Sequence, residues 1–232
     1  MVGDPRSLEA ATARRGEKLE IPAQARLTRG LVRRRLIPVS YLIFFAGLVV
    51  SASIYYHGRP FDPRQAIVSD LEARADNPGG YLASAAGTVL AGVLLLPAAK
   101  VFYTESRTNN PRLTLAGTIL LGLGLAATIT LGALSPFIEA YSEAHIQLAY
   151  TAFTGVCAGT LFLLAASRVS HSFIAFQSVV LLFLGWIFIW PGFLSGTWVL
   201  RSLAFWEWVL CVDCGIAMWV LGRAVDSNHS GD

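Results

Sequence analysis

The sequence has little charge. Only 14% of its 232 residues are Asp, Glu, Lys or Arg, whereas 54% are hydrophobic. Soluble domains carry about 25% charged residues, so this chain lacks the polar surface that a folded domain presents to water. A bilayer core requires the opposite, namely helices of about 20 predominantly apolar residues each. The composition therefore predicts an integral membrane protein with no separate soluble domain.

The sequence also lacks the motifs of common chemistry. It has no phosphate loop, no dinucleotide fingerprint and no nucleophile elbow. It has no HxxxH or HExxH pattern, which would place two metal ligands on one helical face, so neither a metal nor a cofactor is expected. Cysteine is scarce, and Cys157, Cys211 and Cys214 all lie in apolar runs. Their setting favours buried small side chains over a thioredoxin-like redox motif.

Long apolar runs make up most of the chain. Six of them predict transmembrane helices, which gives an all-α, polytopic bundle. A basic arm (1–35) precedes this membrane domain (36–222), and a short polar tail (223–232) follows it. A long polar loop (57–80) separates the first two helices. The six predicted helices are 36–56, 81–103, 113–137, 145–167, 173–194 and 198–221.

The basic residues are distributed unevenly. Nine of the 18 Lys and Arg residues precede residue 36. The 104–112 loop is also basic, whereas the loops 57–80 and 139–145 carry more acidic than basic residues. Because Lys and Arg concentrate on the cytoplasmic side, this alternation predicts cytoplasmic termini and an even number of helices. The expected location is the cell membrane, either plasma or bacterial inner membrane.

The arm suggests partners for the cytoplasmic face. It lacks interleaved aromatic residues, so no nucleic-acid partner is predicted. Arg33, Arg34 and Arg35 stand at the expected lipid boundary, where each charge contributes about 1 kcal/mol to binding anionic lipid. A cytosolic protein is the alternative partner for the arm.

Ionisable residues within or beside membrane helices are costly and indicate candidate sites. Asp70, His145 and Glu207 are all predicted on the outer side, where they would act as acid and base or bind a lipid headgroup. Ser69 is a further candidate lipid contact. A purely structural hydrogen bond for Glu207 remains equally open. Lys100 and Asp213 are predicted to form a structural ion pair nearer the cytoplasm.

Small residues predict close helix packing. Gly155 and Gly159 form a GxxxG pattern on the fourth predicted helix. Such patterns let helix backbones approach closely. Packing within the bundle is favoured over dimerisation through this face, and the sequence does not decide the oligomeric state.

Several short motifs resemble those of the Frag1/DRAM/Sfk1 membrane family. The first is an outer I-x-S-D-L stretch at 67–71, followed by Asn77-Pro78. A His stands at the mouth of the fourth helix in Ala144-His145-Ile146, and the sixth helix contains Phe205-Trp206-Glu207-Trp208. The resemblance implies six helices and a role in lipid remodelling, phospholipid asymmetry or autophagy. It also implies that Ser69, Asp70, His145 and Glu207 form one shared polar group.

Three functional hypotheses follow. The first is a protein that binds or remodels lipid headgroups at the outer leaflet through the Asp70, His145 and Glu207 group. The second is a non-enzymatic scaffold or regulator in which these residues stabilise the bundle. The third is a small-solute transporter, for which no inverted repeat is visible. The residues do not decide whether the protein is an enzyme.

Overall fold

The computed structural model describes residues 30–31, 35–62, 68–107, 109–138, 142–167, 169–189 and 202–227. Within these ranges the regular secondary structure is entirely helical, so the predicted all-α class is confirmed. Most of the N-terminal arm lies outside the described residues, as do Arg33 and Arg34. The main helices are α3 (Ile37–Tyr55), α4 (Val68–Glu72), α5 (Tyr81–Ser106), α6 (Pro111–Leu134), α7 (Glu143–Ala166), α8 (His171–Ile189) and α9 (Leu203–Ser227).

Five of these helices are long and apolar enough to span a bilayer, namely α3, α5, α6, α7 and α9. A sixth, α8, has an apolar stretch over His171–Trp186. The protein is therefore a multi-pass membrane protein by length and composition. The ends of α3, α5, α6 and α7 agree with the sequence prediction to within three residues. The predicted start of the last helix, at 198, lies outside the described residues.

The helix starts follow from local chemistry. Asn110 precedes α6, and its side chain accepts a hydrogen bond from Leu113 N at 3.2 Å. Pro111 follows at the first helical position, where its missing N–H has no partner to lose. Ser142 caps α7 in the same way by accepting from His145 N at 3.3 Å. Both caps satisfy backbone donors that a helix start otherwise leaves unpaired.

Glycines set the closest helix contacts. A Cβ added at Gly155 on α7 would lie 2.6 Å from the Cα of Gly124 on α6, and one at Gly159 would collide with the backbone of Leu121. No side chain fits there, so α6 and α7 cross backbone to backbone. The prediction that Gly155 and Gly159 pack within the bundle is thus confirmed.

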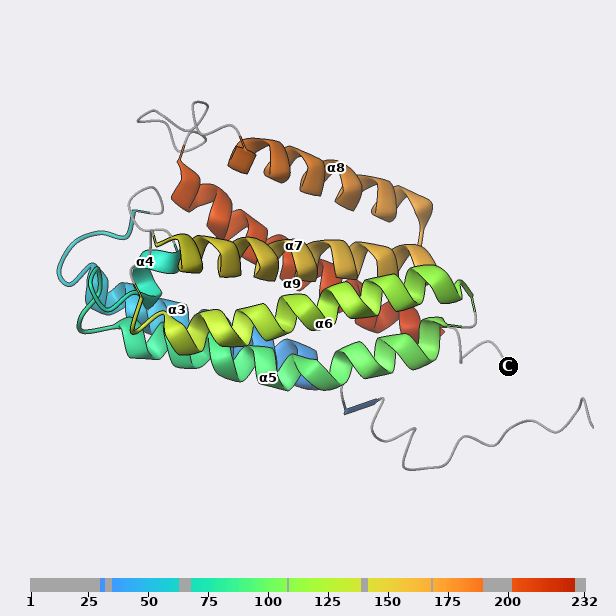
Figure 1. Ribbon diagram of the computed structural model, residues 1–232, viewed down its shortest axis with the longest axis horizontal. Coiled ribbons are helices and arrows are strands. Elements are labelled where there is room, and N and C mark those ends of the chain that lie inside the picture. The colour runs from blue at the N-terminus through green and yellow to red at the C-terminus, as the bar shows by residue number, and fades with distance from the viewer. Residues whose placement is uncertain are drawn as a thin grey trace, which may run out of the picture.

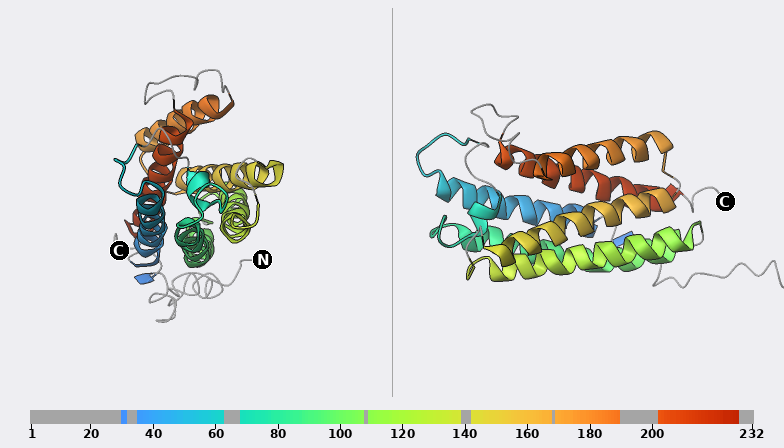
Figure 2. Two further views of the ribbon diagram at one scale, coloured as in Figure 1. Left: turned by 90° about the vertical axis from the view of Figure 1, so that its left-hand side faces the viewer. Right: turned by 45° about the horizontal axis from the view of Figure 1, so that its top comes forward.

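The helices surround a common interior. Figure 1 shows α5, α6 and α7 as neighbouring antiparallel helices, with α3 and α9 completing the bundle and α8 lying outside α7 and α9. The two further views agree with this arrangement (Figure 2). The short helix α4 lies at one end of the bundle, and α9 ends at the opposite end (Figure 1). The bundle is therefore covered by α4 at the end where α3 finishes and α5 begins.

Candidate functional site

The carboxylate of Glu207 holds the start of α4. Its Oε2 accepts a hydrogen bond from the backbone N–H of Val68 at 2.6 Å, and its Oε1 lies 3.5 Å from the hydroxyl of Ser69. The first N–H groups of a helix lack partners within the helix, so a carboxylate there satisfies a donor. Glu207 comes from the second turn of α9, and it therefore caps α4 from another helix.

Hydrogen bonds also fix the backbone carbonyl of Leu71, near the other end of α4. The Leu71 oxygen accepts from Ser84 Oγ at 2.6 Å, Ser51 Oγ at 2.8 Å and Asn77 Nδ2 at 3.3 Å. Asn77 also donates to Ser51 Oγ at 2.8 Å and accepts from Gly80 N at 3.1 Å. These bonds fix α4 on the ends of α3 and α5. The described residues 68–80 thus lie over this end of the bundle.

Glu72 is the second carboxyl group in this region. It is buried, and it accepts hydrogen bonds from Thr88 Oγ1 on α5 and from Ser135 Oγ, the latter at 3.4 Å. Burial raises the pKa of Glu72 to about 7, although the bonds from Thr88 and Ser135 oppose the shift. Loss of hydration disfavours the charged form, which is the cause of the rise. Glu72 therefore titrates near neutral pH.

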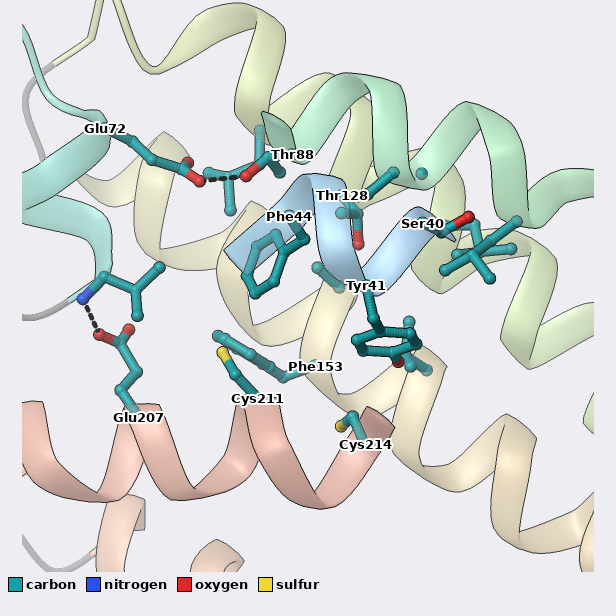
Figure 3. Close-up of a pocket in the computed structure, with 18 of the residues that line it drawn as sticks. Ser40, Tyr41, Phe44, Glu72, Thr88, Thr128, Phe153, Glu207, Cys211 and Cys214 are labelled. Atoms are coloured by element: carbon teal, nitrogen blue, oxygen red, sulfur yellow. Dashed lines mark hydrogen bonds between the residues drawn. The ribbon is translucent and has the colours of Figure 1, made fainter. Parts of the chain in front are cut away.

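A cavity of about 100 Å³ lies between the helices below α4. Glu72 and Glu207 both line it, and Figure 3 shows them at the end of the cavity next to α4. Tyr41 and Cys214 line the opposite end (Figure 3). Apolar side chains from α3, α5, α6 and α7 form most of the wall, among them Phe44, Ala91, Leu95, Leu125, Ala152 and Phe153.

The chemistry of two carboxyl groups at one end of a largely apolar cavity depends on their protonation. Ionised carboxylates accept hydrogen bonds and attract cations, and a protonated carboxyl also donates. Glu72 and Asp70 are near enough to Glu207 for their charges to interact with it. Like charges close together disfavour the fully ionised state. The site can therefore receive a proton or the donor group of a ligand.

The structure brings together three of the four predicted outer residues. Ser69, Asp70 and Glu207 all lie at α4 and are buried. His145 is also buried, but neither ring nitrogen has a hydrogen-bond partner, and it does not line the cavity. No described hydrogen bond connects it to Asp70 or Glu207. The expected acid–base combination of His145 with these carboxylates is therefore not formed in the described part of the chain.

The structure also places the residues of the other predicted contacts, namely Lys100, Asp213 and Arg35. Asp213 on α9 accepts a hydrogen bond from Gln177 Nε2 on α8 at 3.1 Å, whereas Lys100 on α5 is exposed. The expected ion pair between Lys100 and Asp213 is not formed between these two described residues. Arg35 is exposed just before α3, and nothing in the structure tests its binding to lipid.

Sequence reasoning missed Glu72, Thr88 and Ser135. Glu72 stands in an acidic loop beside Asp70 and Asp76, and hydropathy does not distinguish a buried carboxyl there from exposed ones. The one available signal is spacing: Ser69 and Glu72 are three residues apart and so share a face of a helix. Thr88 gave no signal, because a single Thr is common in an apolar helix.

Among the described residues, no group of three or more His, Cys, Asp or Glu side chains is placed to hold a metal ion. The chain matches no protein-family model, no curated protein and no solved structure. The function must accordingly be argued from the site itself.

Proposed function

We propose that this multi-pass membrane protein binds part of a lipid, or a similar apolar molecule, in the cavity below α4. The apolar portion would lie against Phe44, Phe153 and the neighbouring aliphatic side chains. A polar group of the ligand would face Glu72 and Glu207. The observation that supports this is the position of two buried carboxyl groups at one end of a largely apolar cavity.

The size and charge of the cavity restrict the ligand. A cavity of about 150 Å³ in an apolar core accepts benzene, so about 100 Å³ admits only a small molecule or a section of an acyl chain. Carboxylates repel phosphate and accept hydrogen bonds from amines and hydroxyls. We therefore infer a ligand whose polar group is an amine or a hydroxyl rather than a bare phosphate. Membership of the Frag1/DRAM/Sfk1 family is part of this proposal and rests on the motifs alone.

A second candidate function is a non-enzymatic scaffold or regulator. One observation favours it: both carboxyl groups already bond to the protein, Glu207 to Val68 and Glu72 to Thr88. In that case the carboxyl groups hold α4 in place and no ligand is needed. The two functions predict different effects of substituting either Glu. Ligand binding predicts loss of the bound molecule, whereas the scaffold predicts loss of stability alone.

The test is to purify the full-length protein in mild detergent and identify the lipids that remain bound by native mass spectrometry. Glu72→Gln and Glu207→Gln keep the size of each side chain but remove its charge. Glu143→Gln, at an exposed position on α7, is the matched control. The proposal expects bound lipid in the wild type and the control and its loss in both cavity variants. Equal lipid in all four proteins, with lower stability in the cavity variants, would favour the scaffold.

A further inference from the structure

Two cysteines from different helices meet inside the bundle. The Sγ atoms of Cys157 on α7 and Cys214 on α9 lie 3.1 Å apart, and neither residue is in a disulfide. A disulfide bond needs about 2.05 Å between the sulfur atoms, so a shift of about 1 Å would join them. Cys211 is one turn earlier on α9, and no described contact joins its sulfur to another cysteine. The close pair is therefore Cys157 and Cys214 rather than the C-V-D-C pair within α9.

A small cavity lies beside this pair. Cys157, Cys214 and Asp213 line one small cavity of about 10 Å³, together with Gln177. A space of that size is close to the minimum for one water molecule. Asp213, which accepts a hydrogen bond from Gln177, lines the same space.

The pair lies deep in its helices. Cys214 is eleven residues after the start of α9 at Leu203, which is about 16 Å along a helix axis. The hydrocarbon core of a bilayer is about 30 Å thick, so this position is near its middle. Cys214 also lines the main cavity beside the Tyr41 ring. At this depth the surrounding medium is hydrocarbon, so an oxidant that dissolves in the bilayer approaches the half-buried Cys157 more readily than one confined to water.

We propose that Cys157 and Cys214 form a redox-active dithiol that a membrane-soluble quinone oxidises. Two S–H bonds break and one S–S bond forms. Two electrons and two protons pass to the quinone, which becomes a quinol. The product ties α7 to α9 at the wall of the main cavity. This inference does not rest on the proposed lipid binding: Cys214 lines the main cavity, but the dithiol does not involve Glu72 or Glu207.

The test uses the reduced full-length protein in lipid nanodiscs with a short-chain ubiquinone. After acid quenching and denaturation, remaining thiols are counted with a maleimide mass tag, and quinol is measured by absorbance. Wild type should lose two of its three reactive thiols and form one quinol per disulfide. Peptide mapping should find Cys157 joined to Cys214, a result that does not depend on any variant folding.

Single substitutions complete the test. Cys211→Ser should still lose both remaining thiols, whereas Cys157→Ser and Cys214→Ser should lose none. Oxidised glutathione, which is water-soluble, should react at least about tenfold more slowly than the quinone. Three tagged thiols in quinone-treated wild type, a mapped disulfide that includes Cys211, or a faster reaction with glutathione would each overturn the proposal.

Discussion

The carboxylate of Glu207 accepts a hydrogen bond from the backbone N–H of Val68 at 2.6 Å, across 139 positions of the chain. The bond joins the second turn of the last helix to the first residue of α4. The short helix α4 is thereby fixed over the end of the bundle. The same bond places Glu207 at the polar end of the main cavity.

Removing this carboxylate should loosen α4. Glu207→Ala leaves the Val68 N–H buried without its partner, which costs about 1–3 kcal/mol of folding free energy. We expect a lower melting temperature in detergent and faster proteolysis of the 57–80 loop. Glu207→Gln keeps an acceptor oxygen and should lose less than Glu207→Ala. Equal melting temperatures for the wild type and the Ala variant would contradict this role.

Stability should fall as pH rises from about 4.5 to about 7. The pKa of the Glu72 carboxyl is 4.5 in its ordinary state and about 7 in the folded protein, so the folded state holds the proton more tightly. The stabilisation is complete below pH 4.5, is lost as pH rises to about 7, and changes no further above that. Its full size is roughly 3 kcal/mol, at 1.36 kcal/mol for each pH unit.

The measurement for Glu72 is a series of thermal melts between pH 5 and pH 8. Glu72→Gln cannot ionise, so the wild type should lose stability across this range relative to that variant. Thr88→Val removes a hydrogen bond that lowers the pKa of Glu72, so the loss of stability should extend to higher pH. Parallel curves for wild type and Glu72→Gln would show that this carboxyl does not control the pH response.

The α6–α7 crossing should not tolerate a side chain at Gly124. A Cβ there would lie within 3.0 Å of the Gly155 Cα, so Gly124→Ala must push the helices apart. Overpacking of this kind typically costs about 1–3 kcal/mol. Gly122→Ala on the same helix is the matched control, since nothing lies within 4 Å of its Cβ. It should be neutral or up to about 1 kcal/mol stabilising, because Ala favours helix over Gly.

Thermal melts of both glycine variants decide this point. A lower melting temperature for Gly124→Ala alone confirms the backbone contact. Similar melting temperatures for the two variants would be inconsistent with a crossing that depends on Gly124.

Labelling should place α4 on the outside of the cell. In a background without native cysteines, Arg59→Cys should react with a membrane-impermeant maleimide added to intact cells. Asn109→Cys should react only after permeabilisation, because the basic 104–112 loop is expected in the cytoplasm. Both positions are exposed in the structure. The opposite pattern would reverse the predicted orientation.

The helices were predictable because each is a long apolar run with polar ends. The placement of Glu207 beside Ser69, at one end of the bundle, also followed from counting residues along the predicted helices. The burial of Glu72 did not follow, since it depends on α4 folding back between Thr88 and Ser135, which are distant in sequence. The partner of Asp213 was also not predictable. Lys100 was chosen because its charge is opposite to that of Asp213, whereas the observed partner, Gln177, is uncharged.

Filling the cavity tests the central claim most directly. Ala152 on α7 is buried and lines the cavity, so Ala152→Leu occupies the space proposed for the ligand. Ala165, also on α7, is exposed, and Ala165→Leu makes the same change outside the cavity. Native mass spectrometry should find bound lipid or a similar small molecule on the wild type and Ala165→Leu, and little on Ala152→Leu. Equal amounts on Ala152→Leu and the wild type would contradict ligand binding in this cavity.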